Sequence, residues 1–318
     1  MDNLTHTIIA TAIGTSILAD KPVHKHTIRI ALVSAFIAFM PDLDFVLRFK
    51  SHTLYALEHR GFTHSILGMV VLIPLGAYIA RHFLCKAFDV SWGLAFKYSF
   101  AIWFFGHIVP DFFTIYGVQI LYPFSNMHYD YALTFIIDIM FWIFGVAYLI
   151  VFFKIPTLSL RLSNMFLGFL ILTYITYAGI RFDVVNDFQQ KHPTVHNIKY
   201  TPIMHPFVAY NVFGDSDKGY VQRVDSNIKT LPIFGKLIYK DTYPYMPKNL
   251  IQNALPNNGV YSNTSKYLFE RYQLFALALV CEAVPSGANC SSLKYKYPSV
   301  GVYQRETKVL DRHIPFKQ

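Results

Sequence analysis

Charged side chains are scarce in this sequence. Only 15% of its 318 residues are Asp, Glu, Lys or Arg, whereas 53% are hydrophobic and 17% are aromatic. An ordinary soluble domain carries about 25% charged residues, so the composition favours a membrane protein. Apolar runs dominate from Ile8 to Ile180, and after Arg181 the sequence becomes polar, with frequent proline and tyrosine. We therefore predict a transmembrane domain at 1–181 and an extramembrane domain at 182–318.

Dense blocks of lysine and arginine are also missing, although the formal net charge is +9. The cations are scattered at the ends of apolar runs and through the C-terminal part, which is typical of membrane anchoring and topology. No nucleic-acid partner is therefore predicted. The N-terminus lacks a basic segment, and no small-residue cleavage site follows its first apolar run, so a cleavable signal peptide is not expected.

Cysteine is rare, with three residues in the whole chain. Cys85 ends an apolar run and is most simply a packing residue. Cys281 and Cys290 flank a Pro-Ser-Gly loop in the polar part. They would form a disulfide if this part is exported, and they would be two free thiols in a reducing cytosol.

Motifs for covalent catalysis and for phosphate-cradling loops are absent. The sequence has no Gly-x-Ser-x-Gly elbow, no Cys–His arrangement and no Walker loop. The nucleophile of any hydrolysis would therefore be water.

The apolar runs predict about six membrane helices, at residues 4–19, 28–46, 66–84, 92–113, 132–153 and 162–180. A membrane-spanning helix needs roughly 17–25 residues, so the first run is short, and a tilted or half-buried helix is an alternative for it. After Phe182, short apolar runs alternate with Gly, Pro and Asn, a pattern of strands and turns. The expected fold is an α-helical multi-pass membrane domain followed by a mixed, strand-containing extramembrane domain.

The connectors between these runs predict an orientation. If all six runs cross, one side holds Lys21, Lys25, Arg29, Arg81, Lys86, Lys154 and Arg161, and the short connectors of the other side hold Arg48, Lys50 and Arg60. The richer side should be cytoplasmic. The N-terminus and the C-terminal domain would then lie on the periplasmic side.

Ionisable residues gather at the junctions on that second side. They lie at the start of the first run, at the ends of the second and fourth runs, in the loop before the third run, and about two turns into the fifth run. The group comprises His6, Asp42, Asp44, His59, His64, His107, Asp111 and Asp138. Ionisable groups at a bilayer are costly and usually functional, so we predict that they form one site.

Two motifs in this group have the residue types of a metal site. His107 and Asp111 are four residues apart and share a helix face. In Pro41-Asp42-Leu43-Asp44, proline breaks the helix, and one carboxylate can bind metal while the other orients a histidine or activates water. The alternative for each motif is a capped or solvated helix end. Histidine and aspartate without thiolates suit zinc, and also manganese or iron, in a site of one or two ions.

At these residues the sequence resembles the YdjM type of bacterial and archaeal membrane-bound metal-dependent hydrolase-like proteins. The matching pieces, in the order of that family, are Met1-Asp2-x-Leu4-Thr5-His6, Pro41-Asp42-Leu43-Asp44, His59-Arg60-Gly61-x-Thr63-His64-Ser65, His107-x-x-x-Asp111, Tyr116-Gly117 with Pro123-Phe124-Ser125, and Phe135-Ile136-Ile137-Asp138. They cover roughly residues 1 to 160. The resemblance implies a bacterial inner-membrane protein with metal-dependent hydrolase activity. The ligand order is also similar, more weakly, to zinc-dependent phospholipase C and P1-type nucleases, although their N-terminal tryptophan and later His-x-x-x-Glu pair have no counterpart here.

We therefore predict metal-assisted hydrolysis of a phosphoester in a lipid or lipid-linked substrate at the outer membrane interface. The expected ligands are His6, Asp42 or Asp44, His64, His107 and Asp111, with His59 as a ligand or acid/base group. Arg60, beside both histidines, would clamp a phosphate, and Asp138 would orient a ligand. The alternatives are a non-catalytic membrane protein with a structural metal site, and an ion or solute transporter.

Overall fold

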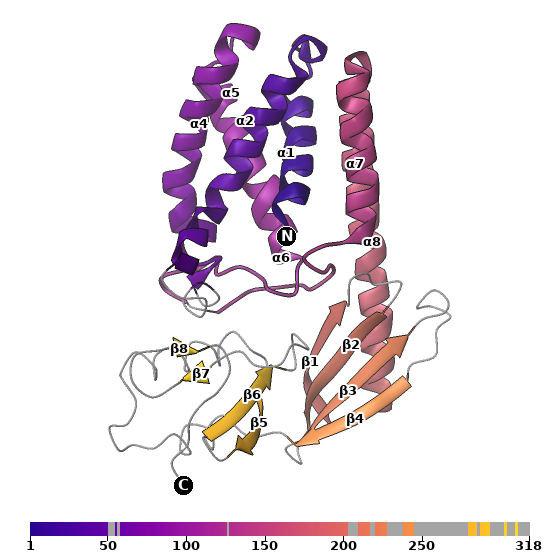
Figure 1. Cartoon of the computed structure of the whole chain (residues 1–318). Coiled ribbons are helices and arrows are strands. Elements are labelled where there is room, and N and C mark those ends of the chain that lie inside the picture. The colour runs from indigo at the N-terminus through magenta and orange to yellow at the C-terminus, as the bar shows by residue number, and fades with distance from the viewer. Residues whose placement is uncertain are drawn as a thin grey trace.

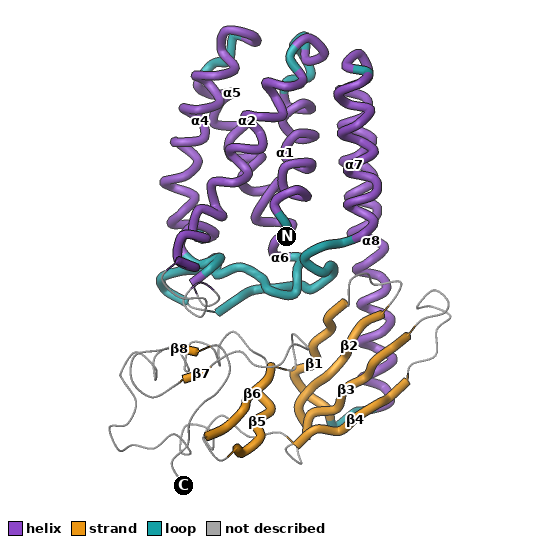
Figure 2. The backbone as a smooth tube through the Cα atoms, viewed as in Figure 1, coloured by secondary structure: helices purple, strands orange, loops and turns teal. Residues whose placement is uncertain are grey.

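A computed structural model describes residues 1–49, 55, 58–125 and 127–202, together with the strand segments 209–216, 220–227, 238–244, 279–284, 287–292, 302–303 and 309–310. The N-terminal part is helical, and its long helices run side by side (Figure 1). The C-terminal part contributes strands (Figure 2).

Six helical segments form the bundle, and polar side chains begin several of them. The α1 helix, Asn3–Ile17, is capped by Asp2, whose side chain accepts from Thr5 N. Side-chain oxygens of Ser65 and Ser91 cap α4, Ile66–Phe88, and α5, Trp92–Trp103, in the same way. Each cap satisfies a backbone N–H that has no partner within its helix. The other helices are α2, Thr27–Phe39; α7, Ile139–Lys154; and α8, Ser159–Lys191.

Two of these segments change their winding at the end where the ionisable residues lie. The α2 helix continues as a 3₁₀ helix, Met40–Phe49. After α5 come a π-helical turn, Phe104–Ile108, and the short α6, Val109–Phe112. A proline near each change, Pro41 and Pro110, lacks the N–H that a regular α-helix would use. Short 3₁₀ turns at Val23–Lys25, Phe62–His64 and Pro156–Leu158 complete the connections.

Three helical segments of the described chain are long and apolar enough to cross a membrane: Thr27–Phe49, Ile66–Phe88 and Pro156–Lys191. Large apolar side chains point outward from them, as Leu32, Val70 and Leu172 do. The α7 helix is apolar but has 16 residues, and α1 has 15. The helical N-terminal region is therefore confirmed with about three candidate spans, and six crossings stay a prediction.

The expected helix at 132–153 is wrong in its first turns. Residues 132–138 form a loop, in which the N–H groups of Leu133 and Thr134 donate to Phe113 O. The helix begins only at Ile139, because Asp138 caps it by accepting from Met140 N. Asp138 is therefore the N-cap of α7 and does not lie two turns inside a helix.

The α1 helix packs in the centre of the bundle, against α2, α5, α7 and α8. The packing is close at Gly14, where a Cβ atom would collide with Ser34 and Tyr98. These two side chains hydrogen-bond to each other at 2.6 Å between Ser34 Oγ and Tyr98 Oη. The glycine lets α1 approach its neighbours and so fixes where the first residues of α1 lie.

Four antiparallel strands follow α8 in the order β1-β2-β3-β4: Val195–Pro202, Ala209–Ser216, Tyr220–Asn227 and Ile238–Pro244. Side chains from the last turns of α8, such as Tyr177 and Phe188, share a hydrophobic core with Tyr200 and Val212 of β1 and β2. Two further hairpins pair β5, Leu279–Val284, with β6, Gly287–Ser292, and β7, Val302–Tyr303, with β8, Val309–Leu310. The strands expected in this part are present. Because α8 runs past residue 181, the boundary of the extramembrane domain stays a prediction.

Candidate metal centre

The buried histidine, aspartate and arginine side chains of the described residues lie at one end of the helical bundle. They belong to the start of α1, the 3₁₀ continuation of α2, the turn before α4, the end of α5 with α6, and the N-cap of α7. Consecutive helices run in opposite directions, so these ends meet (Figure 1). The side chains are His6, Asp42, Arg60, His64, His107, Asp111 and Asp138. The gathering predicted from the alternating runs is therefore present.

Four of these side chains form a set of metal-donor size, which we call the buried donor set: Asp42, His64, His107 and Asp111. The Nε2 atoms of His64 and His107 are 3.0 Å apart. His64 Nε2 lies 3.6 Å from Asp42 Oδ1 and 3.3 Å from Asp111 Oδ2, and His107 Nε2 lies 3.5 and 3.6 Å from the same two oxygens. Ligands bound tetrahedrally at about 2.0–2.2 Å stand about 3.3–3.6 Å from one another. The four imidazole–carboxylate distances thus have the dimensions of a tetrahedral zinc site, and the two imidazole nitrogens lie slightly closer together.

Hydrogen bonds fix the ring nitrogens that face this set. The Thr63 hydroxyl donates its hydrogen to Asp44 Oδ2 at 3.1 Å. Thr63 Oγ must therefore accept the hydrogen bond that it shares with His64 Nδ1 at 3.0 Å, so that His64 Nδ1 carries the proton. The Nε2 lone pair of His64 therefore faces the donor set. Burial lowers the pKa of His64 to about 3, so the ring is neutral at pH 7. Such outer hydrogen bonds normally set the tautomer of a metal-binding histidine.

His6 lies beside the buried donor set. Its Nδ1 donates to Gly106 O at 3.0 Å, its ring stacks on that of His107 with centroids 3.8 Å apart, and its Nε2 is 3.3 Å from Asp111 Oδ1. Among the described residues, His6 Nε2 and Asp111 Oδ2 are buried atoms without a hydrogen-bond partner. Asp111 Oδ2 faces the Nε2 atoms of His64 and His107, and a buried carboxylate oxygen without a hydrogen bond is costly unless a cation binds it. The residues present therefore fit a divalent cation.

A second set of possible donors adjoins the first, and we call it the outer donor set: Asp42, Asp44 and His59. His59 Nδ1 lies 2.8 Å from Asp44 Oδ1. The Asp42 and Asp44 side chains are 11% and 8% exposed, whereas the His59 side chain is 23% exposed. This set opens toward solvent, and the His64, His107 and Asp111 side chains are fully buried.

Arg60 connects the centre to the loop after α6. Its guanidinium lies 2.8 Å from Asp111 Oδ1 and donates to Thr114 Oγ and Gly117 O. Its backbone N–H donates to Asp44 Oδ2, with φ at 66°. Arg60 thus positions two acidic side chains at once, and its predicted phosphate-clamp role stays a prediction.

Asp138 contacts α7 and α8. It caps Met140 N and accepts from Tyr177 Oη at 3.4 Å. Burial raises the pKa of Asp138 to about 6. Its predicted role in orienting a ligand stays a prediction.

Two contributors were missed in the sequence. The amino group of Met1 is buried and contacts Asp111 Oδ1. Thr63 joins Asp44 to His64, as described above. No local pattern signals the first, but the position of Thr63 directly before His64 could have indicated the second.

Comparison with known proteins fits this arrangement. The YdjM inner membrane protein model matches residues 1–182, more than half of the chain. The chain belongs to the YdjM inner membrane protein family. All the residues of both donor sets lie within the YdjM match, and the match together with the apolar helices identifies a membrane protein.

One curated relative, "Uncharacterized protein YfhP" of Bacillus subtilis (strain 168), is 31% identical over 134 residues. The aligned part is 40% of this chain and 38% of the relative, so the chain spans well under half of that protein. No solved structure matches the chain. The comparisons give no support to the weaker likeness to phospholipase C and P1-type nucleases. The protein is thus a YdjM family membrane protein with a buried His/Asp cluster that could hold a divalent metal ion.

Proposed function

We propose that this YdjM family protein is a metal-dependent hydrolase. Its substrate would be a phosphoester of a lipid or lipid-linked molecule at the membrane interface. The observation that carries the proposal is the spacing of the two imidazole nitrogens, His64 Nε2 and His107 Nε2, from the oxygens of Asp42 and Asp111, at 3.3–3.6 Å. This spacing and the absence of thiolates favour zinc, with manganese and iron as further candidates.

The residues of the centre would have three different roles: metal binding, positioning of the ligands, and acid/base chemistry. Asp42, His64, His107 and Asp111 would hold an ion, and a divalent ion with an open coordination position polarises a phosphoryl oxygen and lowers the pKa of water. Arg60 and Thr63 hold Asp111, Asp44 and His64 in place. His59 is the most exposed of the candidate donors, and its Nδ1–H donates to Asp44. Its Nε2 is then free to take a proton from water or to bind an ion.

The location of the centre supports a lipid substrate at the interface. The ionisable groups lie at one end of helices whose outward faces are apolar. We place this end on the periplasmic side, following the excess of lysine and arginine in the opposite connectors. An ion pathway would need such groups through the full depth of the bundle, whereas here the buried charged side chains of the described part gather at one end.

A structural metal site is the second candidate, and the full burial of His64, His107 and Asp111 favours it. Activity separates the two. The detergent-solubilised protein, loaded with Zn²⁺ or Mn²⁺, would be assayed on bis(p-nitrophenyl) phosphate and on phospholipids. We expect turnover that EDTA abolishes, and the His107→Ala, Asp111→Asn double variant should lower it on the order of 10²-fold or more. His82→Ala, an exposed histidine of α4, is the matched control. Bound metal without turnover of any phosphoester would leave a structural site only.

A further inference from the structure

The two donor sets have a single residue in common. Asp42 belongs both to the buried donor set and to the outer donor set. Its Oδ1 faces His64 and His107, at 3.6 and 3.5 Å. A carboxylate has a second oxygen, and a carboxylate that uses both oxygens can join two ions about 3.5–4 Å apart.

The acidic side chains of the two donor sets differ in the charged groups that surround them. The fixed positive charge at the centre, on Arg60, contacts Asp111. In the described part of the chain, the ion-pairing partners of the Asp42 and Asp44 side chains are imidazoles only. Two largely buried carboxylates held close together without a fixed cation are costly. A cation in the outer donor set would offset that cost.

We infer that the protein binds two divalent cations bridged by Asp42, one in each donor set. The buried ion has four protein donors, a closed set typical of a structural site. The outer ion has three, from Asp42, Asp44 and His59, which leaves positions open for water or a phosphoryl oxygen, as in catalytic sites. The exposure of His59 provides the access. This inference rests on the proposed metal binding and assigns the chemistry to the outer ion.

Metal content and magnetism test this inference without an activity assay. The intact protein in detergent would be loaded with Mn²⁺, desalted, and examined by elemental analysis and electron paramagnetic resonance. We expect about two ions per chain and an exchange-coupled spectrum. Asp44→Asn and His59→Ala should each remove one ion and leave the six-line spectrum of an isolated Mn²⁺, whereas His82→Ala should change neither readout.

Each other result has a definite meaning. One ion in the unaltered protein overturns the two-ion centre and leaves the proposed hydrolase intact. Two ions without coupling overturn the bridge through Asp42. No ion at all overturns the proposed function as well.

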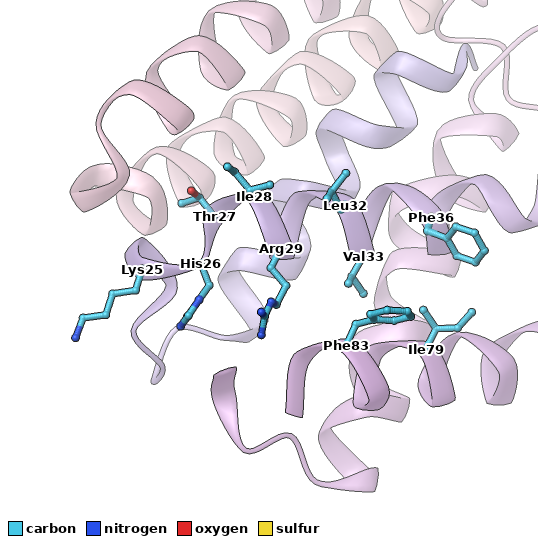
Figure 3. A pocket seen from close by; sticks show the side chains of 10 residues that line it. All are labelled: Lys25, His26, Thr27, Ile28, Arg29, Leu32, Val33, Phe36, Ile79 and Phe83. Carbon is cyan, nitrogen blue, oxygen red and sulfur yellow. The ribbon is translucent and has the colours of Figure 1, made fainter. Parts of the chain in front are cut away.

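A separate observation concerns the opposite end of the bundle. An open groove of about 740 Å³ runs between α2 and α4. Figure 3 shows Arg29, near the start of α2, pointing toward the helix that carries Ile79 and Phe83. Arg29 and Asp42 are 13 residues apart along one helical segment, about 20 Å at 1.5 Å per residue, so this groove is remote from the metal centre.

The groove has the chemistry of a lipid site. Its mouth carries Lys25, His26 and Arg29, and its length is lined by apolar side chains, among them Phe36 and Phe83, both 55% exposed. Basic residues at the end of an apolar groove between membrane helices match an anionic head group with its acyl chain. Independently of the first inference, we propose that this groove binds an anionic phospholipid, with its phosphate on Lys25 and Arg29.

Lipid-dependent stability tests this second proposal. The Tm would be measured in nanodiscs of phosphatidylcholine with and without phosphatidylglycerol. We expect a higher Tm with the anionic lipid, and loss of that difference in Lys25→Ala, Arg29→Ala. The control, Lys154→Ala, Arg161→Ala, removes two charges from another connector at this end and should keep the difference. Equal Tm values in both lipids overturn the proposal. A protein dimer that dissociates in the Lys25→Ala, Arg29→Ala variant also overturns it, because the groove would then be a subunit interface.

Discussion

The Nε2 atoms of His64 and His107 face each other across 3.0 Å, although 43 residues separate them in the chain. His64 lies in a turn before α4, and His107 lies in the π-helical turn after α5. The two residues lie at the open end of the hairpin that α4 and α5 form, so their proximity depends on how these two helices pack against each other.

This proximity predicts non-additive losses of metal affinity. His64→Ala or His107→Ala should each release the buried ion, because the removal of either imidazole leaves this site with three of its four donors. The double variant should then bind no more weakly than the single ones. Competition titration with a chromophoric zinc chelator measures these affinities. Strictly additive losses would show that the two rings do not bind the same ion.

Arg60→Lys should weaken metal binding by about 10- to 100-fold, the usual effect of losing a group that orients a ligand. A lysine ammonium cannot contact Asp111, Thr114 and Gly117 at once in the fork geometry that the guanidinium provides. The same chelator titration measures this change. Lys97→Arg, a conservative exchange of opposite sense in α5, should leave the affinity unchanged. Unaltered affinity in Arg60→Lys would remove the positioning role.

Asp138→Asn should stabilise the metal-free protein at pH 7.5. Burial raises the pKa of Asp138 to about 6, above the value of about 3.9 in an unfolded chain. The folded protein therefore holds this proton more tightly, and its stability relative to Asp138→Asn falls as the pH rises from about 4 to 6. The difference would reach up to about 3 kcal/mol, since one pKa unit corresponds to about 1.4 kcal/mol.

Asparagine retains the N-cap of α7, so the comparison isolates the charge. Thermal unfolding of both proteins in EDTA, from pH 4 to 7.5, measures it. Parallel Tm curves across this range would contradict the raised pKa.

Cys281 and Cys290 are predicted to form a disulfide. Their residues stand opposite each other in the register of β5 and β6, whereas their side chains lie outside the described part of the structure. With Cys85 free, one of the three thiols should react with maleimide in the denatured, unreduced protein, and all three should react after reduction. Three reactive thiols before reduction would contradict the disulfide and weaken the periplasmic placement.

The sequence could predict that the ionisable residues meet, because consecutive apolar runs that alternate in direction leave few arrangements open. It could not predict the distances. These depend on the 3₁₀ helix after Phe39 and the π turn at Phe104–Ile108. Pro41 indicates a break in the first helix but not the 3₁₀ winding there, and the π turn reads as continuous apolar helix in the sequence. The apolar stretch at 132–137 was misassigned for a related reason: its backbone bonds to Phe113, a partner that no local pattern reveals.

The π turn has a consequence for how this centre tolerates change. One residue of an α-helix corresponds to about 100° of rotation. The π turn holds one residue more than a regular turn, so deleting one residue from it would restore α winding and leave Asp111 facing Asp42. Deleting Val109, outside this turn, would instead rotate Asp111 away from Asp42, while α5 kept its contacts with α1 and α4. A chain shortened at Val109 would thus insert and fold as a bundle yet turn its carboxylate out of the centre, so that loss of one codon would separate membrane assembly from metal capture.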